Sequence, residues 1–229
     1  MSVVIVDYGS GNLRSAAKAF ERAAADTATA VVVSSDPKAL KAASHIVLPG
    51  QGAFADCKRG LEGVAGMTEA LEEAVIGEGK PFLGICVGMQ LMAKTGHEHG
   101  DHQGLGWIDA KVTAIDAPAC AAGATTARPR PAGADPASFK IPHMGWNDLK
   151  VRDPSHPLFS GIGTGRHVYF VHSYRILCER PGDVIAEVDY GGPLVAAVGR
   201  DNMVGTQFHP DKSQATGLQL IANFLDWRP

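Results

Sequence analysis

A single cysteine lies between two glycines in residues 84–88, GICVG, where an apolar strand-like run gives way to a helix-like segment. The G-x-C-x-G spacing is typical of a nucleophile elbow, a sharp turn whose glycines prevent collisions with neighbouring backbone. A helix that begins after Cys86 favours a thiolate, and the Val87 N–H can donate to a developing oxyanion. Taken alone, the pattern fits a small buried residue at a tight strand–helix crossing equally well.

A candidate general base lies near the C-terminus, in residues 205–213, GTQFHPDKS. His209 ends an apolar run, and in an extended segment the Asp211 side chain lies on the same face. A carboxylate in that place fixes the imidazole tautomer and stabilises the imidazolium, as in a catalytic triad. The alternative for an isolated His-Pro-Asp is a surface turn in which Asp211 caps the following helix.

A glycine-rich turn in residues 48–54, LPGQGAF, is a candidate for the second oxyanion donor. Glycines at 50 and 52 allow the backbone to turn the N–H groups of Gln51 and Gly52 into the space above a sheet. By itself this is only a turn after a strand. All three segments, however, follow predicted strands, and doubly wound sheets place their sites at such carboxyl ends. Together they predict a cysteine-based acyl-transfer site.

The elements that must position these residues alternate along the first half of the chain. Apolar runs predict strands at 3–7, 30–35, 45–50 and 81–85, and helical spacing predicts helices at 13–25, 36–43, 67–79 and 87–96. Continuous apolar strands separated by helices indicate an α/β fold with a parallel sheet covered on both faces. Further strands are predicted at 106–116, 167–176, 183–190 and 194–208, with a hairpin turn at 200–202, before a final helix at 217–227.

Length, charge and cysteine usage narrow the class of protein. A chain of 229 residues can bury one substantial core, so we expect a single domain over 1–229. The net charge of −3 does not indicate a nucleic-acid or membrane-surface partner. No apolar run is long enough to span a bilayer, and the N-terminus lacks the basic residues of a signal peptide, so neither a membrane span nor a signal peptide is expected. Four cysteines without CxxC spacing favour a reducing cytoplasm, and we interpret Cys57, Cys120 and Cys178 as inert. Residues 117–139, rich in alanine, proline and glycine, predict a surface loop inserted in the domain.

The motifs GICVGMQ and FHPDKS resemble the nucleophile and His-Pro-Glu signatures of the class I, or triad, glutamine amidotransferases. Within that family, VDYGSGNLRS, LPGQGAF, IPHMGWN, YFVHSY and GTQFHPDKSQ together resemble the branch that supplies ammonia for histidine biosynthesis. The resemblance extends from residue 3 to about residue 225, with the insertion outside it. It implies the class I amidotransferase fold, with helices on both faces of a mostly parallel sheet and antiparallel strands in the C-terminal half.

The resemblance also implies a reaction without a cofactor. Cys86 would attack the carboxamide of L-glutamine, with His209 as general base and acid and Asp211 as its orienting carboxylate. The N–H groups of Val87 and of the turn at Gln51 and Gly52 would hold the oxyanion. The residues implied in glutamine binding are Gly52, Gln90, Glu98, His172, Ser173 and Tyr174.

A partner is implied as well, a separate (β/α)8-barrel cyclase that forms a heterodimer with this chain and uses the ammonia. Such a barrel takes about 250 residues, so the present chain is too short to contain it. The segments that resemble the family's docking face contain Asn12, Trp146, Asn147 and Lys212.

Two residues depart from the family pattern. Asp211 replaces the usual glutamate, which means either a closer backbone or a looser contact with His209, and Gln51 replaces an apolar residue in the turn. The rival interpretations are another class I amidotransferase subunit, a free-standing cysteine hydrolase, or a regulatory scaffold with a disabled triad.

Other clusters carry less weight. The histidines and carboxylates of residues 97–102 match no zinc spacing, so a solvated loop is expected there and no metal. His143 and His172 could rival His209 as base, but neither is followed by a carboxylate at the right offset.

Overall fold

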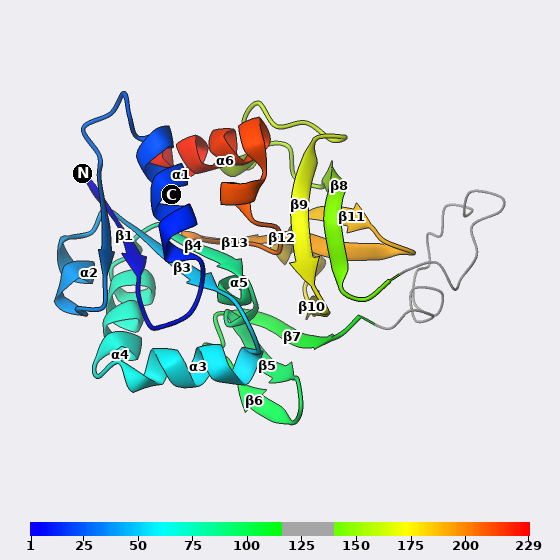
Figure 1. Cartoon of the computed structure of the whole chain (residues 1–229), viewed down its shortest axis with the longest axis horizontal. Helices are drawn as coiled ribbons and strands as arrows, with labels where there is room; N and C mark the ends of the chain where they lie inside the picture. The colour runs from blue at the N-terminus through cyan, green and yellow to red at the C-terminus, as the bar shows by residue number, and fades with distance from the viewer. Residues whose placement is uncertain (116–139) are drawn as a thin grey trace.

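The computed structural model describes residues 1–115 and 140–229, and its centre is a nine-stranded mixed sheet with the order β2-β1-β3-β4-β13-β12-β11-β8-β9 (Figure 1). Neighbouring strands in the first half pair in parallel: β2 (Ala30–Ser34), β1 (Ser2–Val6), β3 (His45–Gly50), β4 (Phe82–Cys86) and β13 (Met203–Thr206). The other half is antiparallel: β12 (Pro193–Arg200), β11 (Val184–Asp189), β8 (His143–Val151) and β9 (His167–His172). This confirms the predicted α/β architecture with antiparallel strands in the C-terminal half.

Helices cover both faces of the parallel half (Figure 1). One face carries α1 (Leu13–Ala23) and α6 (Gln214–Asp226), where Phe20 and Phe224 meet edge to face with ring centroids 6.3 Å apart. The other carries α2 (Lys38–Ala42), α3 (Phe54–Gly63) and α4 (Met67–Leu71), which continues as the π-helix η1 (Glu72–Gly77). Every residue of β3 and β4 is buried, as expected for strands between two helical layers. Short 3-10 turns lie at η4 (Pro157–Phe159), η5 (Pro181–Asp183) and η6 (Pro210–Lys212).

A second sheet, with the order β10-β7-β5-β6, lies beside the first. Its strands are β10 (Tyr174–Cys178), β7 (Ile108–Ala114), β5 (Ala93–His97) and β6 (Asp101–Gln103). The strand predicted over 167–176 is therefore wrong as one element, because the chain leaves the main sheet after His172 and enters the second sheet at Tyr174. The loop predicted at 97–102 is confirmed only for the turn at 98–100, because His97 belongs to β5 and residues 101–102 belong to β6 of a hairpin. Within the described residues no group of three or more ligands could hold a metal ion.

The helix predicted over 87–96 is wrong in its second half. Only one turn forms, α5 (Val87–Gln90), and β5 begins at Ala93. The carbonyls of Leu91 and Met92 accept hydrogen bonds from the N–H groups of Leu105 (2.7 Å) and Ile108 (2.9 Å), which are distant in sequence. Tertiary hydrogen bonds thus replace those that would continue the helix.

The loop predicted over 117–139, including Cys120, lies outside the described residues. In the ranges 1–115 and 140–229 no helix is long and apolar enough to span a bilayer.

Candidate active site

Cys86 is the last residue of β4, and the candidate segments flank it on both sides. β4 lies between β3 and β13 in the sheet, with Gly50 aligned to Cys86 and Thr206 aligned to Ile85. The turn at 50–52 therefore follows the strand on one side, and residues 207–209 follow the strand on the other. The parallel register brings together three segments that are far apart in the sequence.

The backbone at Cys86 has the strained geometry of an elbow. Its φ of 55° and ψ of −111° lie in a region that non-glycine residues rarely adopt. The flanking glycines permit close packing: a Cβ on Gly84 would lie 2.7 Å from the Gly88 carbonyl oxygen, and a Cβ on Gly88 would lie 1.8 Å from that of Leu48. The two glycines therefore have the steric role that the motif predicts.

The glycine-rich turn packs directly on this elbow. A Cβ on Gly50 would lie 2.6 Å from the Gly88 nitrogen, so the two backbones are in contact. The Tyr8 hydroxyl donates to the Pro49 carbonyl at 2.7 Å, and the Ser10 hydroxyl donates to the Gln51 carbonyl at 2.7 Å. The Gln51 N–H donates to Ser10 Oγ at 3.2 Å, so in this conformation the amide is engaged away from Cys86.

His209 and Asp211 lie together on the other side of the elbow, both nearly buried. The His209 Nδ1 and Asp211 Oδ1 atoms are 3.7 Å apart, an ion-pair distance that is longer than a normal hydrogen bond. Burial opposes the charged imidazolium, but contacts with Asp211 and Cys86 outweigh it and raise the pKa of His209 to about 9. Burial likewise opposes the charged carboxylate, but the neighbouring His209 and Ser15 side chains hold the pKa of Asp211 below its ordinary value. A charged His209 is the partner that a Cys86 thiolate requires.

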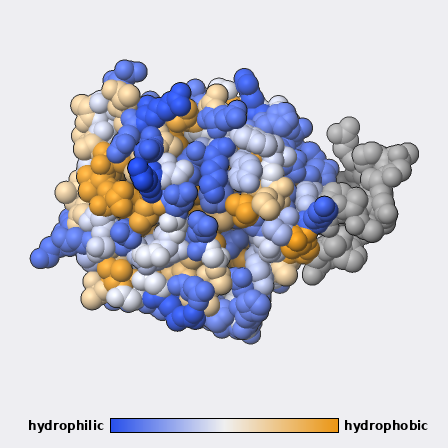
Figure 2. Space-filling model, in the orientation of Figure 1, coloured by the Kyte–Doolittle hydropathy of each residue, from blue (hydrophilic) through white to orange (hydrophobic). Residues whose placement is uncertain are grey.

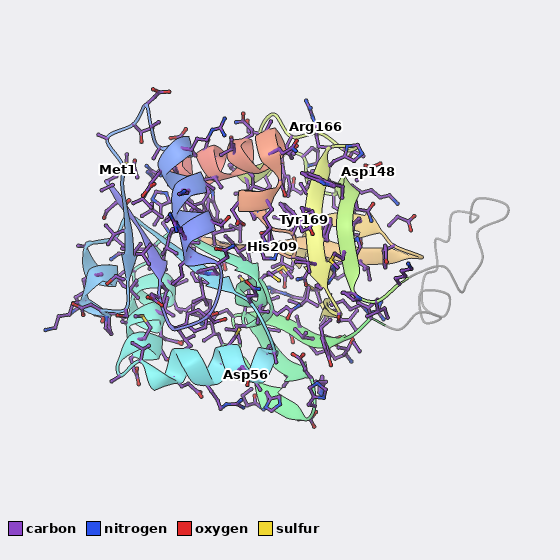
Figure 3. The ribbon with its side chains drawn as sticks, in the orientation of Figure 1. Met1, Asp56, Asp148, Arg166, Tyr169 and His209 are labelled. Atoms are coloured by element: carbon purple, nitrogen blue, oxygen red, sulfur yellow. The ribbon has the colours of Figure 1, made fainter. Side chains whose placement is uncertain are left out.

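The main chain of His209 is fixed from both directions. Its N–H donates to the Tyr169 carbonyl on β9 at 3.0 Å, and its carbonyl accepts from the Ser213 hydroxyl at 2.7 Å. Figure 3 shows His209 close to Tyr169, beside β9. The imidazole therefore projects from a rigid support.

A buried amide pair completes the region around the sulfur. Gln90 Nε2 donates to Gln207 Oε1 at 3.0 Å and to the Tyr174 carbonyl at 3.3 Å, and Gln207 Nε2 donates to Cys86 Sγ at 3.7 Å. Gln90 was predicted from the motif, whereas Gln207 was not. A signal existed, because Gln207 precedes His209 by two residues and an extended segment places both on one face.

His143 and His172 form a buried pair of neutral rings. The His143 Nδ1 and His172 Nε2 atoms are 2.8 Å apart, and His172 Nδ1 lies 2.8 Å from the Tyr174 carbonyl oxygen. Burial and mutual repulsion lower the pKa of His143 to about 3, and burial is also the main cause that lowers the pKa of His172 to about 4. Both nitrogens of each ring have partners, so neither ring is free to serve as a base in place of the predicted His209. Within the predicted substrate segment, the Ser173 carbonyl also has a partner, the Ile115 N–H at 2.9 Å.

Glu98 lies near the glycine-rich turn. Its Oε2 accepts from the Phe54 N–H at 2.6 Å, at the start of α3 and two residues after Gly52. Gly52 itself has a φ of +102°, which a side chain would disfavour. The structure thus brings the predicted carboxylate to the predicted glutamine-binding turn.

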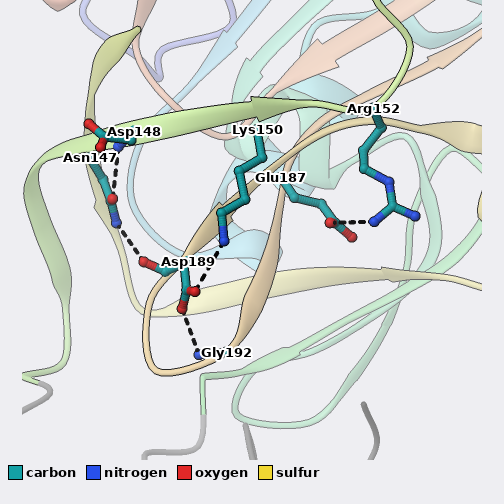
Figure 4. A network of polar contacts seen from close by, with 7 residues as sticks. All are labelled: Asn147, Asp148, Lys150, Arg152, Glu187, Asp189 and Gly192. Atoms are coloured by element: carbon teal, nitrogen blue, oxygen red, sulfur yellow. Dashed lines mark hydrogen bonds and ion pairs between the residues drawn. The ribbon is translucent and has the colours of Figure 1, made fainter. Parts of the chain in front are cut away.

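The predicted interface residues differ in their exposure. Asn12 is exposed and its side chain caps α1 by accepting from the Ser15 N–H at 3.2 Å. Trp146 is 47% exposed, and Met144, two residues earlier, is 59% exposed. Both side chains project from β8. The Asn147 side chain instead turns toward the protein, where its Nδ2 lies 3.2 Å from His143 Nε2. The same Nδ2 lies 3.1 Å from the Asp189 carbonyl oxygen (Figure 4).

Lys212 is the last residue of η6, which begins directly after His209, and its positive charge opposes a charge on His209. Two other cysteines fit the inert interpretation. Burial raises the pKa of Cys57 and raises the pKa of Cys178 to about 12, so neither is poised as a thiolate.

Comparison with known proteins identifies the family of the chain. The family description "Glutamine amidotransferase class-I" matches residues 4–227. Proteins named imidazole glycerol phosphate synthase subunit HisH are similar over 100% of both chains, with 55% identity in Rhodospirillum rubrum and 52% in Brucella abortus.

Among solved structures, a glutamine amidotransferase superimposes with a TM-score of 0.65 at 19% identity, covering 97% of each chain. A glutamine amidotransferase from Thermotoga maritima gives a TM-score of 0.60 at 17% identity, over 99% of this chain and 83% of that one. At such identities the structures show the fold, and the family match extends over nearly the whole sequence. The chain belongs to the class I glutamine amidotransferase family.

Proposed function

We propose that this chain is the glutaminase subunit of imidazole glycerol phosphate synthase, which hydrolyses L-glutamine and delivers ammonia to a cyclase subunit in histidine biosynthesis. The observation that carries the proposal is the position of Cys86 on a strained elbow, between the Gly50 turn and His209. Full-length similarity to proteins with that name supports the choice of branch within the family.

The chemistry proceeds through a thioester. The Cys86 thiolate attacks the carboxamide carbon of glutamine, and the Val87 N–H holds the resulting oxyanion. The imidazolium of His209 transfers its proton to the amide nitrogen, the C–N bond breaks, and ammonia leaves. Neutral His209 then takes a proton from water, whose oxygen attacks the thioester. The C–S bond breaks to release glutamate and restore the thiolate and the imidazolium.

The second oxyanion donor requires a rearrangement of the turn at 50–52. The Gln51 N–H is bonded to Ser10 Oγ, so the turn must rotate before this amide can face the Cys86 site. The resting turn, in which the Gln51 N–H bonds to Ser10, implies low activity for the chain alone and a higher activity when a partner favours the rotated turn. Glutamine binding is assigned to Gly52, Gln90, Glu98 and the 172–174 segment.

The partner is a separate (β/α)8-barrel cyclase that combines the ammonia with a ribotide to give imidazole glycerol phosphate and an aminoimidazole-carboxamide ribotide. The exposed Met144 and Trp146 supply the apolar part of the docking face, with Asn12 and Lys212 beside the catalytic segment. A groove of about 340 Å³ adjoins Trp146 and is lined by Trp146, Arg166, His167, Ser213, Gln214, Ala215 and Thr216. Figure 2 shows hydrophobic surface near β8 and over β1 and β2 on a mainly hydrophilic face.

The free cysteines Cys57, Cys86 and Cys178 are compatible with a cytoplasmic heterodimer.

The test is glutamate release from L-glutamine by the chain alone, and then with a barrel cyclase and its ribotide ligand. We expect a very low rate alone and a rise of orders of magnitude in the complex. Equal and substantial rates in both would support a free-standing hydrolase or another amidotransferase branch. No activity in either condition, together with a lack of labelling of Cys86 by a glutamine-like electrophile, would support the disabled scaffold.

A further inference from the structure

We propose that Gln207 is a further catalytic residue, which donates a hydrogen bond from its side-chain amide to Cys86 Sγ and stabilises the thiolate. The inference rests on the proposed role of Cys86 as nucleophile. The spacing of Gln207 to His209 places both on one face of an extended segment, and the role of Gln207 follows from its contacts.

The contact is short enough for a hydrogen bond to sulfur and is shielded from water. Gln207 Nε2 lies 3.7 Å from Cys86 Sγ. Gln207 has no exposed surface and Cys86 is 5% exposed. Because a buried donor cannot be satisfied by solvent, this N–H must find its acceptor in the protein, and a charged acceptor in a dry site makes the stronger bond.

The direction of the amide follows from the backbone carbonyl of Tyr174. A carbonyl oxygen can only accept, so the Gln90 atom 3.3 Å from it must be Nε2. The same Nε2 lies 3.0 Å from Gln207, which must therefore present its oxygen. The nitrogen of Gln207 is then the atom that faces Cys86. The reverse orientation would place two acceptors or two donors against each other.

The carbonyl that sets this direction is itself held firmly. It also accepts from His172 Nδ1 at 2.8 Å, and the His172 ring is fixed in turn by His143, whose Nδ1 lies 2.8 Å from His172 Nε2. His143 packs against Phe170 with ring centroids 4.6 Å apart. The amide of Gln207 is thus the last member of a buried, fully directed set of hydrogen bonds that ends at the sulfur.

A donor in this position acts at two points of the reaction. It stabilises the thiolate before attack, in addition to the charge of the His209 imidazolium. It also stabilises the thiolate as the leaving group when water cleaves the thioester. His209 changes protonation state during the cycle, whereas the Gln207 amide remains a donor throughout.

The experiment compares Gln207→Met and Gln207→Glu with the parent and with Gln219→Met on the exposed surface of α6. Methionine is neutral and similar in volume, and it removes the donor. Glutamate removes the donor but keeps an acceptor for Gln90. The readout is the pH dependence of iodoacetamide labelling at Cys86, measured by mass spectrometry, with thermal unfolding to show that each variant is folded.

We expect the labelling profile of Gln207→Met to move up by roughly one pH unit, in line with a hydrogen bond to a charged group, and kcat to fall about tenfold. Gln207→Glu should move the profile in the same direction, and Gln219→Met should match the parent. If Gln207 only orients Gln90, Gln207→Met would raise KM and leave the labelling profile in place, which would overturn the proposal. If Cys86 of the parent is not labelled at any pH below about 9, the nucleophile assignment fails and this inference fails with it. If Gln207→Met does not fold, the labelling profile of Gln207→Asn decides, since its amide is one methylene further from the sulfur.

Discussion

His209 Nδ1 and Asp211 Oδ1 are 3.7 Å apart, although both side chains are nearly buried and their charges attract. The second oxygen of Asp211, Oδ2, is buried and has no hydrogen-bond partner among residues 1–115 and 140–229. Of the two possibilities raised by the shorter carboxylate, a closer backbone or a looser pair, the geometry supports the looser pair.

Replacement of Asp211 by glutamate should therefore maintain or improve activity. One more methylene can close the gap to His209 and form a direct hydrogen bond, which for a charged pair contributes about 1.5–3 kcal/mol. We expect kcat with the activating partner to equal that of the parent or to exceed it by up to about tenfold. A large loss would show that the backbone is adjusted to aspartate. Asp211→Asn is the matched control, and it should lose activity because the charge is removed.

Cys86→Ala should abolish glutamine hydrolysis and leave the fold intact. Alanine removes the nucleophile but fits the same elbow, since no bulk is added between Gly84 and Gly88. Glutamate release should fall by at least about 10³-fold, the scale of losing a covalent nucleophile. Thermal unfolding and binding to the cyclase should match the parent. Turnover near the parent rate would exclude Cys86 as the nucleophile.

Ser10→Ala should raise the activity of the chain in the absence of its partner. The Ser10 hydroxyl donates to the Gln51 carbonyl and accepts from the Gln51 N–H, so both bonds favour the resting turn. Two such bonds contribute about 0.5–1.5 kcal/mol each, and their loss should increase basal glutamate release by about fivefold or more. Ser155→Ala, on a distant exposed loop, is the control. An unchanged basal rate would mean that the turn does not limit the free subunit.

Trp146→Ala should weaken binding of the cyclase. A half-exposed tryptophan on β8, beside the exposed Met144, has the character of an interface anchor. We expect the Kd to rise by at least about tenfold in a titration calorimetry experiment. Val33→Ala, an exposed apolar residue on the opposite edge strand β2, should leave the Kd unchanged. Equal effects of the two substitutions would place the docking face elsewhere.

His143→Gln should make the protein less sensitive to acid. Burial lowers the pKa of His143 to about 3, so between pH 6.5 and 4 the unfolded chain binds more protons at this site than the folded chain does. The free energy of unfolding therefore decreases as the pH falls through this window. In denaturant titrations at pH 7, 6, 5 and 4, the decrease should be less steep in His143→Gln than in the parent. Gln219→Met, at an exposed position on α6, should retain the parent's slope.

The strands that carry the site could be predicted from sequence because their signals are local. Buried parallel strands read as continuous apolar runs, and the carboxyl ends of β3, β4 and β13 meet by the rules of a parallel sheet. The placement of Cys86, His209 and the Gly50 turn followed from these two facts.

What could not be predicted depends on contacts between distant residues. The helix after Cys86 ends early because Leu105 and Ile108 bond to carbonyls that a longer helix would use, and nothing in residues 87–96 reveals these partners. The His143–His172 pair depends on the register of β8 against β9, which aligns the two residues across 29 positions of chain. The 3.7 Å distance at Asp211 is likewise a result of tertiary geometry, since the sequence is compatible with a tight or a loose contact.

The pairing of β8 with β9 aligns Trp146 with Tyr169, and the Tyr169 carbonyl is the acceptor for the His209 N–H. The surface residue and the main-chain support of the base are therefore direct neighbours across one strand pair. A molecule that binds Trp146 and shifts β8 together with β9 would also move the Tyr169 carbonyl, and with it the main chain of His209, without contacting glutamine. Binding at the outer face would then be coupled to the position of the His209 imidazole.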